Sequence, residues 1–173
     1  MVPAIKAHSI GYPVAGSQLA VTPSVSPGSD GYIPARALSV GMDAPFETTV
    51  AVRFRDVDAM GHVNNAVYAT FLEEARAAYF REVLGERLDL VDTVLVSLAI
   101  EYRHEIGLGD EVTAALTVPD LGTSSIPMEY TIYAGDTEAA TAETTQVLID
   151  TETGSSRPLP DAWRRDIEAF EDW

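Results

Sequence analysis

The chain has 173 residues, 46% of them hydrophobic, and its 27 acidic residues against 11 basic ones give a net charge of −16. This length fits one domain, or one domain with a tail. The absence of cysteine excludes a disulfide scaffold, a Cys-ligated zinc site, an iron–sulfur cluster and a thiol nucleophile. No apolar run reaches the length of a membrane span, and the negative charge argues against a nucleic-acid partner.

The basic residues are almost all arginine, with Lys6 as the only lysine. Few lysines, many carboxylates and abundant Ala and Val are typical of salt-adapted proteins. A large net charge favours solubility and opposes compaction by self-repulsion, which salt screens. We therefore expect a halophilic protein, the alternative being an ordinary acidic protein of the cytosol.

Residues 1–41 differ from the rest of the chain. Lys6, Asp30 and Arg36 are their only Lys, Arg, Asp or Glu residues, and Pro and Gly recur without any helical or strand period. No apolar run follows a basic start, so the segment does not read as a signal peptide, and we expect a cytoplasmic protein. We expect a disordered or non-native extension over 1–41, Met42 as the natural start, and one domain over 42–173.

From Phe46 to Arg55 apolar and polar residues alternate, which predicts a strand. A polar loop over 56–65 follows, and then a helix over about 66–84. The apolar stripe of this helix comprises Tyr68, Phe71, Leu72, Ala75, Tyr79 and Val83. Glu73 and Arg76 are expected on its more polar side.

Four further strands are predicted, over 94–102, 112–118, 126–132 and 138–149, and a short helix over 161–170. Pro127 indicates either the start of a strand or an edge strand. One long helix against one antiparallel sheet is an α+β architecture. Because one helix covers only one face and edge strands stay open, the pattern also indicates an oligomer.

The loop over 56–65 holds the densest cluster of functional side chains. A helix start presents unpaired N–H groups and a partial positive charge, which suit a developing oxyanion. A carboxylate just before it can act as a base or nucleophile. The alternative to a catalytic role is that the Asp, Asn and Gly residues of this loop are ordinary helix-capping and turn residues. A metal site of Asp56, Asp58 and His62 is disfavoured because only one histidine is nearby.

Val52–Arg76, VRFRDVDAMGHVNNAVYATFLEEAR, resembles the signature of the 4-hydroxybenzoyl-CoA thioesterase family of hotdog-fold acyl-CoA thioesterases. The family pattern is a strand, then D-x-D-x-x-G-h-V, then a long central helix. Glu101–Val112 and Val147–Gly154 also fit. The resemblance covers about residues 45–155. It implies a single hotdog domain, a five-stranded antiparallel sheet wrapped around one long central helix.

The resemblance implies a catalytic carboxylate at Asp58, the second Asp of D-x-D, and a carbonyl-polarising N–H at Asn65. The implied substrate contacts are Gly61, His62, Asn64 and Tyr68, although Tyr68 also fits a core position. Met60 stands where some members have Asn, which counts against an Asn-assisted mechanism. In another branch of the hotdog proteins a glutamate on the central helix is catalytic, but Glu73 and Glu74 here fit a charged helix face better.

The implied reaction is hydrolysis of an acyl-CoA or acyl carrier protein thioester to a free acid and a thiol, with no cofactor. The family pairs edge to edge with sites at the subunit boundary, so a homodimer or homotetramer is expected. One alternative is a hotdog enoyl-thioester hydratase or dehydratase, which typically has four residues between its Asp and His; Asp58 and His62 have three. The other is a non-catalytic acyl-thioester binder.

Overall fold

The structure is a computed structural model and describes residues 46–173. The expectation for residues 1–41 lies outside the described residues. Within residues 46–173, two α-helices and five strands form the fold: β1 Phe46–Val50, α1 Asn65–Val83, β2 Thr93–Tyr102, β3 Val112–Thr117, β4 Ser125–Ala134, β5 Thr137–Leu148 and α2 Asp161–Glu171. This order confirms the predicted one.

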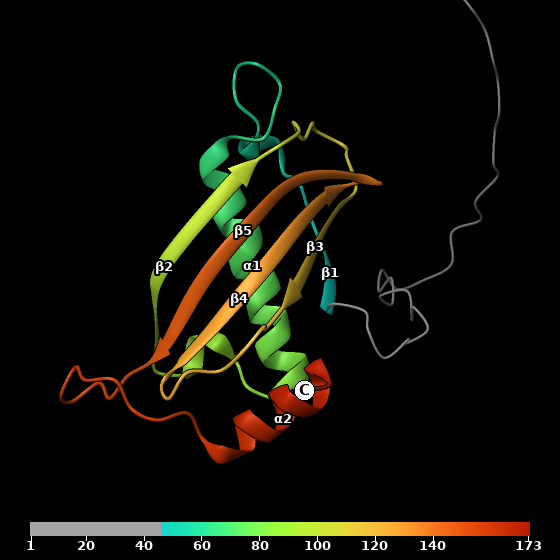
Figure 1. The fold of residues 1–173 in the computed structure, drawn as a ribbon. Coiled ribbons are helices and arrows are strands. Elements are labelled where there is room, and N and C mark those ends of the chain that lie inside the picture. The colour runs from blue at the N-terminus through green and yellow to red at the C-terminus, as the bar shows by residue number, and fades with distance from the viewer. Residues whose placement is uncertain (1–45) are drawn as a thin grey trace, which may run out of the picture. The chain divides into compact units, whose positions relative to one another are not determined.

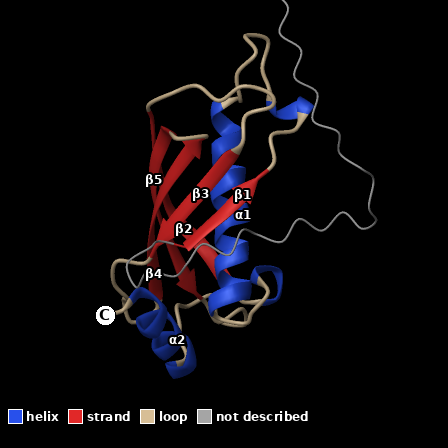
Figure 2. Cartoon of the chain, turned by 90° about the vertical axis from the view of Figure 1, so that its right-hand side faces the viewer, coloured by secondary structure: helices blue, strands red, loops and turns tan. Residues whose placement is uncertain are grey.

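The strands form one antiparallel sheet in the order β1-β3-β4-β5-β2, so β1 and β2 are its edges. Figure 1 shows α1 lying across one face of this sheet and α2 near the C-terminal end of α1. The view turned by 90° shows the same two layers from the side (Figure 2). The α+β hotdog architecture predicted from the sequence is therefore confirmed.

The core lies between α1 and the sheet. The predicted apolar stripe of α1 is buried apart from Val83, which is partly buried. The closest approach of α1 is to β1 and β3. Phe46 of β1 packs edge-on against Tyr79 of α1, with ring centroids 5.4 Å apart. Burial of such large side chains is the main favourable term that fixes α1 on the sheet.

Helix α2 closes the C-terminal end of this core. Trp163 packs edge-on against Phe80, and the Trp173 indole donates to the Val118 carbonyl at 3.1 Å. The Tyr79 hydroxyl donates to Glu171 at 2.8 Å, and burial raises the pKa of both groups. The two tryptophans therefore anchor the C-terminal segment.

Neither helix within residues 46–173 has the length and the apolar composition that crossing a membrane requires.

The first strand is shorter than the alternation predicted. It ends at Val50, and a 3-10 turn over Phe54–Asp56 follows, in which Phe54 is 84% exposed. The Asp56 carboxylate accepts the Arg53 N–H at 2.7 Å and closes this turn, so the alternation past Val50 does not continue as strand. Pro127 stands near the start of β4, which is a central strand, so the edge-strand alternative is wrong.

Arg76 was expected on the polar side of α1, and this expectation is wrong. Its side chain is only 6% exposed and faces the sheet side of the helix, whereas Glu73 is exposed. The Tyr130 hydroxyl of β4 lies beside the Arg76 guanidinium, so the covered part of the helix is wider than the apolar stripe alone.

The outer face of the sheet, away from α1, is acidic. Glu129 of β4 and Glu143 of β5 are directly paired and exposed there, and Glu101 lines the same face. Like charges directly opposite each other on neighbouring strands are destabilising. Part of the acidic excess of the sequence is therefore gathered on this face of the sheet.

This pair predicts a salt-dependent stability. We expect the melting temperature of the protein to rise between low salt and about 2 M KCl, where screening acts within a few ångströms. Glu129→Lys is expected to stabilise the protein at low salt by about 0.2–1 kcal/mol, because it places opposite charges face to face. The gain should shrink at high salt. Thermal unfolding followed by circular dichroism measures both effects.

Glu152→Lys is the matched control, since it makes the same charge change at an exposed loop position after β5. It should give a smaller gain at low salt. A melting temperature that stays flat or falls with KCl would reject salt adaptation, and equal gains from the two variants would reject the role of the cross-strand pair.

Candidate active site

The loop between the 3-10 turn and α1 folds into a small hairpin. Val57 pairs with Val63, and the Asp58 N–H donates to the His62 carbonyl at 2.9 Å. Gly61 occupies the turn with φ +89°, a left-handed conformation that favours glycine. The hairpin is fixed to the loop between β2 and β3, because Val63 N–H donates to the Ile106 carbonyl at 2.7 Å.

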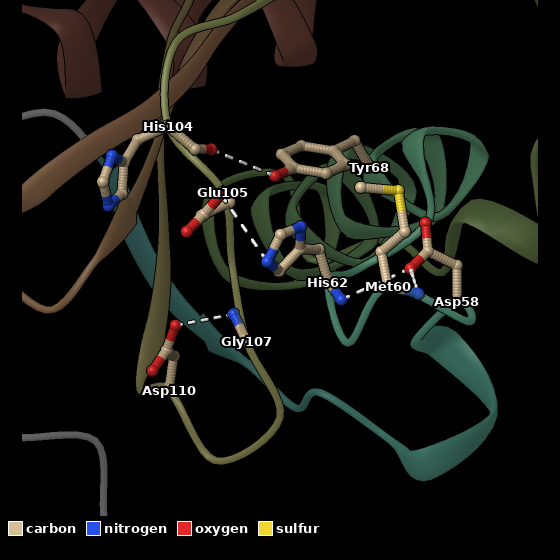
Figure 3. Close-up of polar contacts among 8 residues, drawn as sticks. All are labelled: Asp58, Met60, His62, Tyr68, His104, Glu105, Gly107 and Asp110. Atoms are coloured by element: carbon tan, nitrogen blue, oxygen red, sulfur yellow. Dashed lines mark hydrogen bonds and ion pairs between the residues drawn. The ribbon is translucent and has the colours of Figure 1, made fainter.

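Asp58 holds the tip of this hairpin with one oxygen of its carboxylate. Its Oδ1 accepts the Met60 N–H at 2.8 Å and the His62 N–H at 3.4 Å (Figure 3). No hydrogen bond within residues 46–173 uses Oδ2. The side chain is exposed. The turn therefore orients the carboxylate and leaves one oxygen free for a ligand or a water molecule.

Asn64 and Asn65 form the start of α1. Asn64 is the N-cap, and its Oδ1 accepts the Ala66 N–H at 3.0 Å. The Val67 N–H donates to the Asn64 carbonyl at 2.8 Å. The Asn65 N–H enters no hydrogen bond formed by the part of the chain that the structure describes. Asn65 therefore has the free donor that an oxyanion needs at a helix start.

The end of β2 forms the wall opposite the helix start. The Tyr102 hydroxyl donates to the Asn65 carbonyl at 3.0 Å, and its ring packs edge-on against Tyr68 at 5.0 Å. Tyr68 is buried and donates to the His104 carbonyl at 3.4 Å; burial, followed by the neighbouring Tyr102, raises the pKa of its hydroxyl. Figure 3 shows this contact beside His62, whose Nε2 lies 3.6 Å from Glu105 Oε2.

These elements enclose an open groove of about 580 Å³. Five of the six residues named as site residues from the sequence line it: Asp58, His62, Asn64, Asn65 and Tyr68. Gly61 does not line it and forms the turn instead. Asp56 is buried under the loop, where its carboxylate and carbonyl accept the N–H groups of Arg53 and Asn64.

The wall from β2 and the following loop was not predicted from the sequence; it comprises Tyr102, Arg103, His104 and Glu105. In the sequence, the segment over 101–112 stands out as a piece of the family pattern and carries no sign of a groove wall. Its side chains join the groove through long-range pairing, and no local signal marks them. Within residues 46–173 no cluster of three or more His, Asp or Glu is arranged to hold a metal ion.

The antiparallel sheet with one long helix across it matches the solved structures of thioester hydrolases with a hotdog fold. The sequence model of the thioesterase-like superfamily matches residues 52–167, and the chain belongs to this superfamily.

Three relatives illustrate the range of the match. A thioesterase of Thermus thermophilus, solved in complex with coenzyme A and Zn, is 37% identical with a TM-score of 0.69, covering 75% of this chain and 96% of that one. A 1,4-dihydroxy-2-naphthoyl-CoA hydrolase of Synechococcus elongatus is 25% identical over 75% of this chain and 95% of its own length. The uncharacterized protein YsmA of Bacillus subtilis is 29% identical over 49% of this chain and 58% of its own length.

The left-handed turn at Gly61 gives a test of the loop. A Cβ added at Gly61 meets nothing within 4 Å, so Gly61→Ala acts through the backbone alone, at about 1–2 kcal/mol. We expect lower stability in urea and a loss of thioester hydrolysis of about tenfold or more, because the Asp58 carboxylate shifts.

Gly154→Ala is the matched control, since Gly154 also has a positive φ, +69°, and free space around it, in a turn after β5. It should lose similar stability and keep full turnover. Equal turnover in the two variants would contradict a role of the Gly61 turn in placing Asp58.

Proposed function

We propose that the protein hydrolyses acyl-CoA thioesters with Asp58 as the catalytic carboxylate and the Asn65 N–H as the oxyanion donor. The observation that carries the proposal is that the free Oδ2 of Asp58 and the free N–H of Asn65 belong to residues lining one groove. The motif of the loop supports placing the chain near the 4-hydroxybenzoyl-CoA thioesterases within the superfamily.

In the proposed reaction the thioester carbonyl oxygen accepts the Asn65 N–H. In the general-base route Asp58 Oδ2 takes a proton from water, whose oxygen adds to the carbonyl carbon. Collapse of the tetrahedral intermediate breaks the C–S bond, and the proton on Asp58 passes to the leaving thiolate. In the covalent route Oδ2 attacks the carbon, the C–S bond breaks to give a mixed anhydride and a thiolate, and water then hydrolyses the anhydride and supplies the proton of the thiol. The residues supply all of this chemistry, so no cofactor is required.

The start of α1 stabilises the intermediate at its charged oxygen. A fixed donor at such a position contributes about 3–4 kcal/mol in comparable sites. The partial positive charge of the helix start acts in the same direction. The Tyr102 hydroxyl donates to the Asn65 carbonyl, in the peptide unit that follows the donor, and so fixes the first turn of the helix.

Coenzyme A as the thiol carrier is supported by the Thermus thermophilus relative that was solved with coenzyme A bound. The chain itself carries a strong negative charge, which disfavours docking of an acidic carrier protein. We therefore propose CoA rather than acyl carrier protein as the usual carrier.

We further propose that the active unit is a homodimer joined at the free edge of β2. Most large apolar side chains of this edge strand are 38–59% exposed in the single chain: Val94, Leu95, Val96, Leu98 and Tyr102. A long, apolar, unpaired edge strand is a template for pairing with another chain. Because β2 ends at the groove, a partner there would complete its wall.

The proposed mechanism predicts that Asp58→Asn folds and binds substrate but loses about 100-fold or more in turnover, the low end of a general-base contribution. Asparagine keeps the shape and can still accept the Met60 N–H, so the hairpin should persist. Release of free thiol from a panel of acyl-CoA substrates is the measurement.

Asp56→Asn is the control, because Asp56 is buried and caps the 3-10 turn. It should lose far less turnover. If the two variants behave alike, or Asp58→Asn stays active, the assignment is wrong. Enoyl-CoA hydration without thiol release would instead favour the hydratase alternative.

The dimer proposal predicts twice the chain mass in light scattering. Val96→Lys places a charge on the β2 edge and is expected to give monomers. Thr49→Lys makes the same addition at an exposed position on the opposite edge, β1, and should stay dimeric. A wild-type monomer with full activity, or dissociation by Thr49→Lys alone, would overturn this interface.

A further inference from the structure

A second cavity, of about 620 Å³, lies further along α1, beside the start of β2. Residues of α1, β2, β5 and the 3-10 turn before β2 line it. Three arginines and two carboxylates are among them, and one of these carboxylates, Asp89, is already bound by Arg87 at 2.7 Å. Arg81 is likewise paired, with Glu82 at 3.0 Å, so Arg76 is the arginine of this cavity that no ion pair within residues 46–173 includes.

Arg76 is the buried member of this group. It is 6% exposed, its Nε is fully buried without a hydrogen-bond partner, and no ion pair formed within residues 46–173 includes it. A buried guanidinium without an anion is costly. Its polar neighbour is the neutral Tyr130 hydroxyl, and no carboxylate within residues 46–173 lies at ion-pair distance from this cation.

Gln146 of β5 lies in the same cavity and is 4% exposed. Its Nε2 donates to Thr93 Oγ1 at 2.8 Å, and its Oε1 is buried without a partner. If the side-chain amide of Gln146 is turned by 180°, Oε1 and Nε2 exchange places. The Thr93 hydroxyl then donates to Oε1, and the N–H groups of Nε2 are free for an anion. Arg76 and Gln146 together can thus present donors to one carboxylate.

A half-exposed apolar strip of β2 lies between this cavity and the groove at Asp58. Directly paired residues of antiparallel strands share a face, so Leu95, Leu98 and Tyr102 face the same side as their buried β5 partners. All three are 42–47% exposed, because α1 packs closest to β1 and β3. An apolar chain along this strip would start at the groove and end at Arg76.

The helix sets the length of such a chain. Arg76 lies eleven residues after Asn65, or about 16 Å along the axis at roughly 1.5 Å per residue. An extended chain advances about 1.2 Å per bond, and the arginine side chain leans back toward the helix start. The span therefore corresponds to an acyl chain of about 8–14 carbons.

We propose that Arg76 and Gln146 bind a carboxylate at the far end of the acyl chain, so that the preferred substrates are monothioesters of dicarboxylic acids. This inference rests on the proposed thioester hydrolysis and names its substrate class. A terminal carboxylate supplies the missing anion and accepts from both side chains. A plain acyl chain would leave the buried guanidinium against its methyl end.

The test compares CoA thioesters of 8, 10, 12 and 14 carbons with and without a terminal carboxylate. Wild-type kcat/KM is expected to favour the carboxylate form by about tenfold or more at one of these lengths. Arg76→Met should abolish the preference while hydrolysis of the plain thioester stays within about threefold. Its stability should hold or rise, because it removes an unpaired buried charge.

Arg165→Met, at an exposed position on α2 outside the cavity, is the control and should keep the wild-type preference. Gln146→Leu is the second variant, and it should reduce the preference even if Arg76→Met does not fold. A wild-type preference for plain chains, or a carboxylate preference that Arg76→Met leaves unchanged, overturns the proposal. Dissociation of a dimer by Arg76→Met without a wild-type preference would assign Arg76 to a partner's carboxylate instead, and also overturns it.

If no thioester is hydrolysed, the proposed function fails, and calorimetric titration with decanoate and 1-decanol still decides this inference. Wild type should then bind decanoate, which has a carboxylate, about tenfold more tightly than 1-decanol, which has none, and Arg76→Met should bind both equally. Equal binding of the two compounds by the wild type overturns the inference.

Discussion

The first turn of α1 is the part of the molecule on which the site depends, because it is fixed from three directions. Asn64 N–H donates to the Asp56 carbonyl, the Tyr102 hydroxyl holds the Asn65 carbonyl, and Val63 ties the preceding hairpin to the loop after β2. These bonds bring together segments up to about forty residues apart in sequence. They hold the surroundings of the Asn65 N–H rigidly, while the described chain leaves that N–H itself free.

The second constraint is the off-centre packing of α1. Helix α1 packs closest to β1 and β3, aromatic pairs join it to β1 and to α2, and α2 closes the same core from its end. The inner face of β2 is left about half exposed, and this one asymmetry has two consequences. It exposes the strand that would pair with a second copy, and it opens the strip between the groove and Arg76.

Local patterns in the sequence were enough for most of the fold, because alternation and helical spacing report which face of an element is buried. They failed at two side chains: Asp56 caps a turn that follows the end of β1, and Arg76 is buried beside Tyr130 of the sheet. The loop residues of the site could be named because Asp58, Asn64 and Asn65 lie within eight residues of one another. Tyr102 and Glu105 could not, since the contacts that bring the end of β2 to the helix start, Tyr102 with Asn65 and Val63 with Ile106, are long-range.

The central claim is that the Asn65 N–H receives the thioester oxygen. Its most direct test is the ¹⁵N–¹H spectrum of the protein titrated with an acyl-CoA analogue in which a methylene separates the carbonyl from the sulfur, so that the carbonyl cannot be cleaved. The account predicts that the Asn65 amide signal shifts downfield more than those of Ala66 and Val67, whose N–H groups are already bonded to Asn64. An unchanged Asn65 signal in a saturated complex, with shifts at other groove amides, would contradict it.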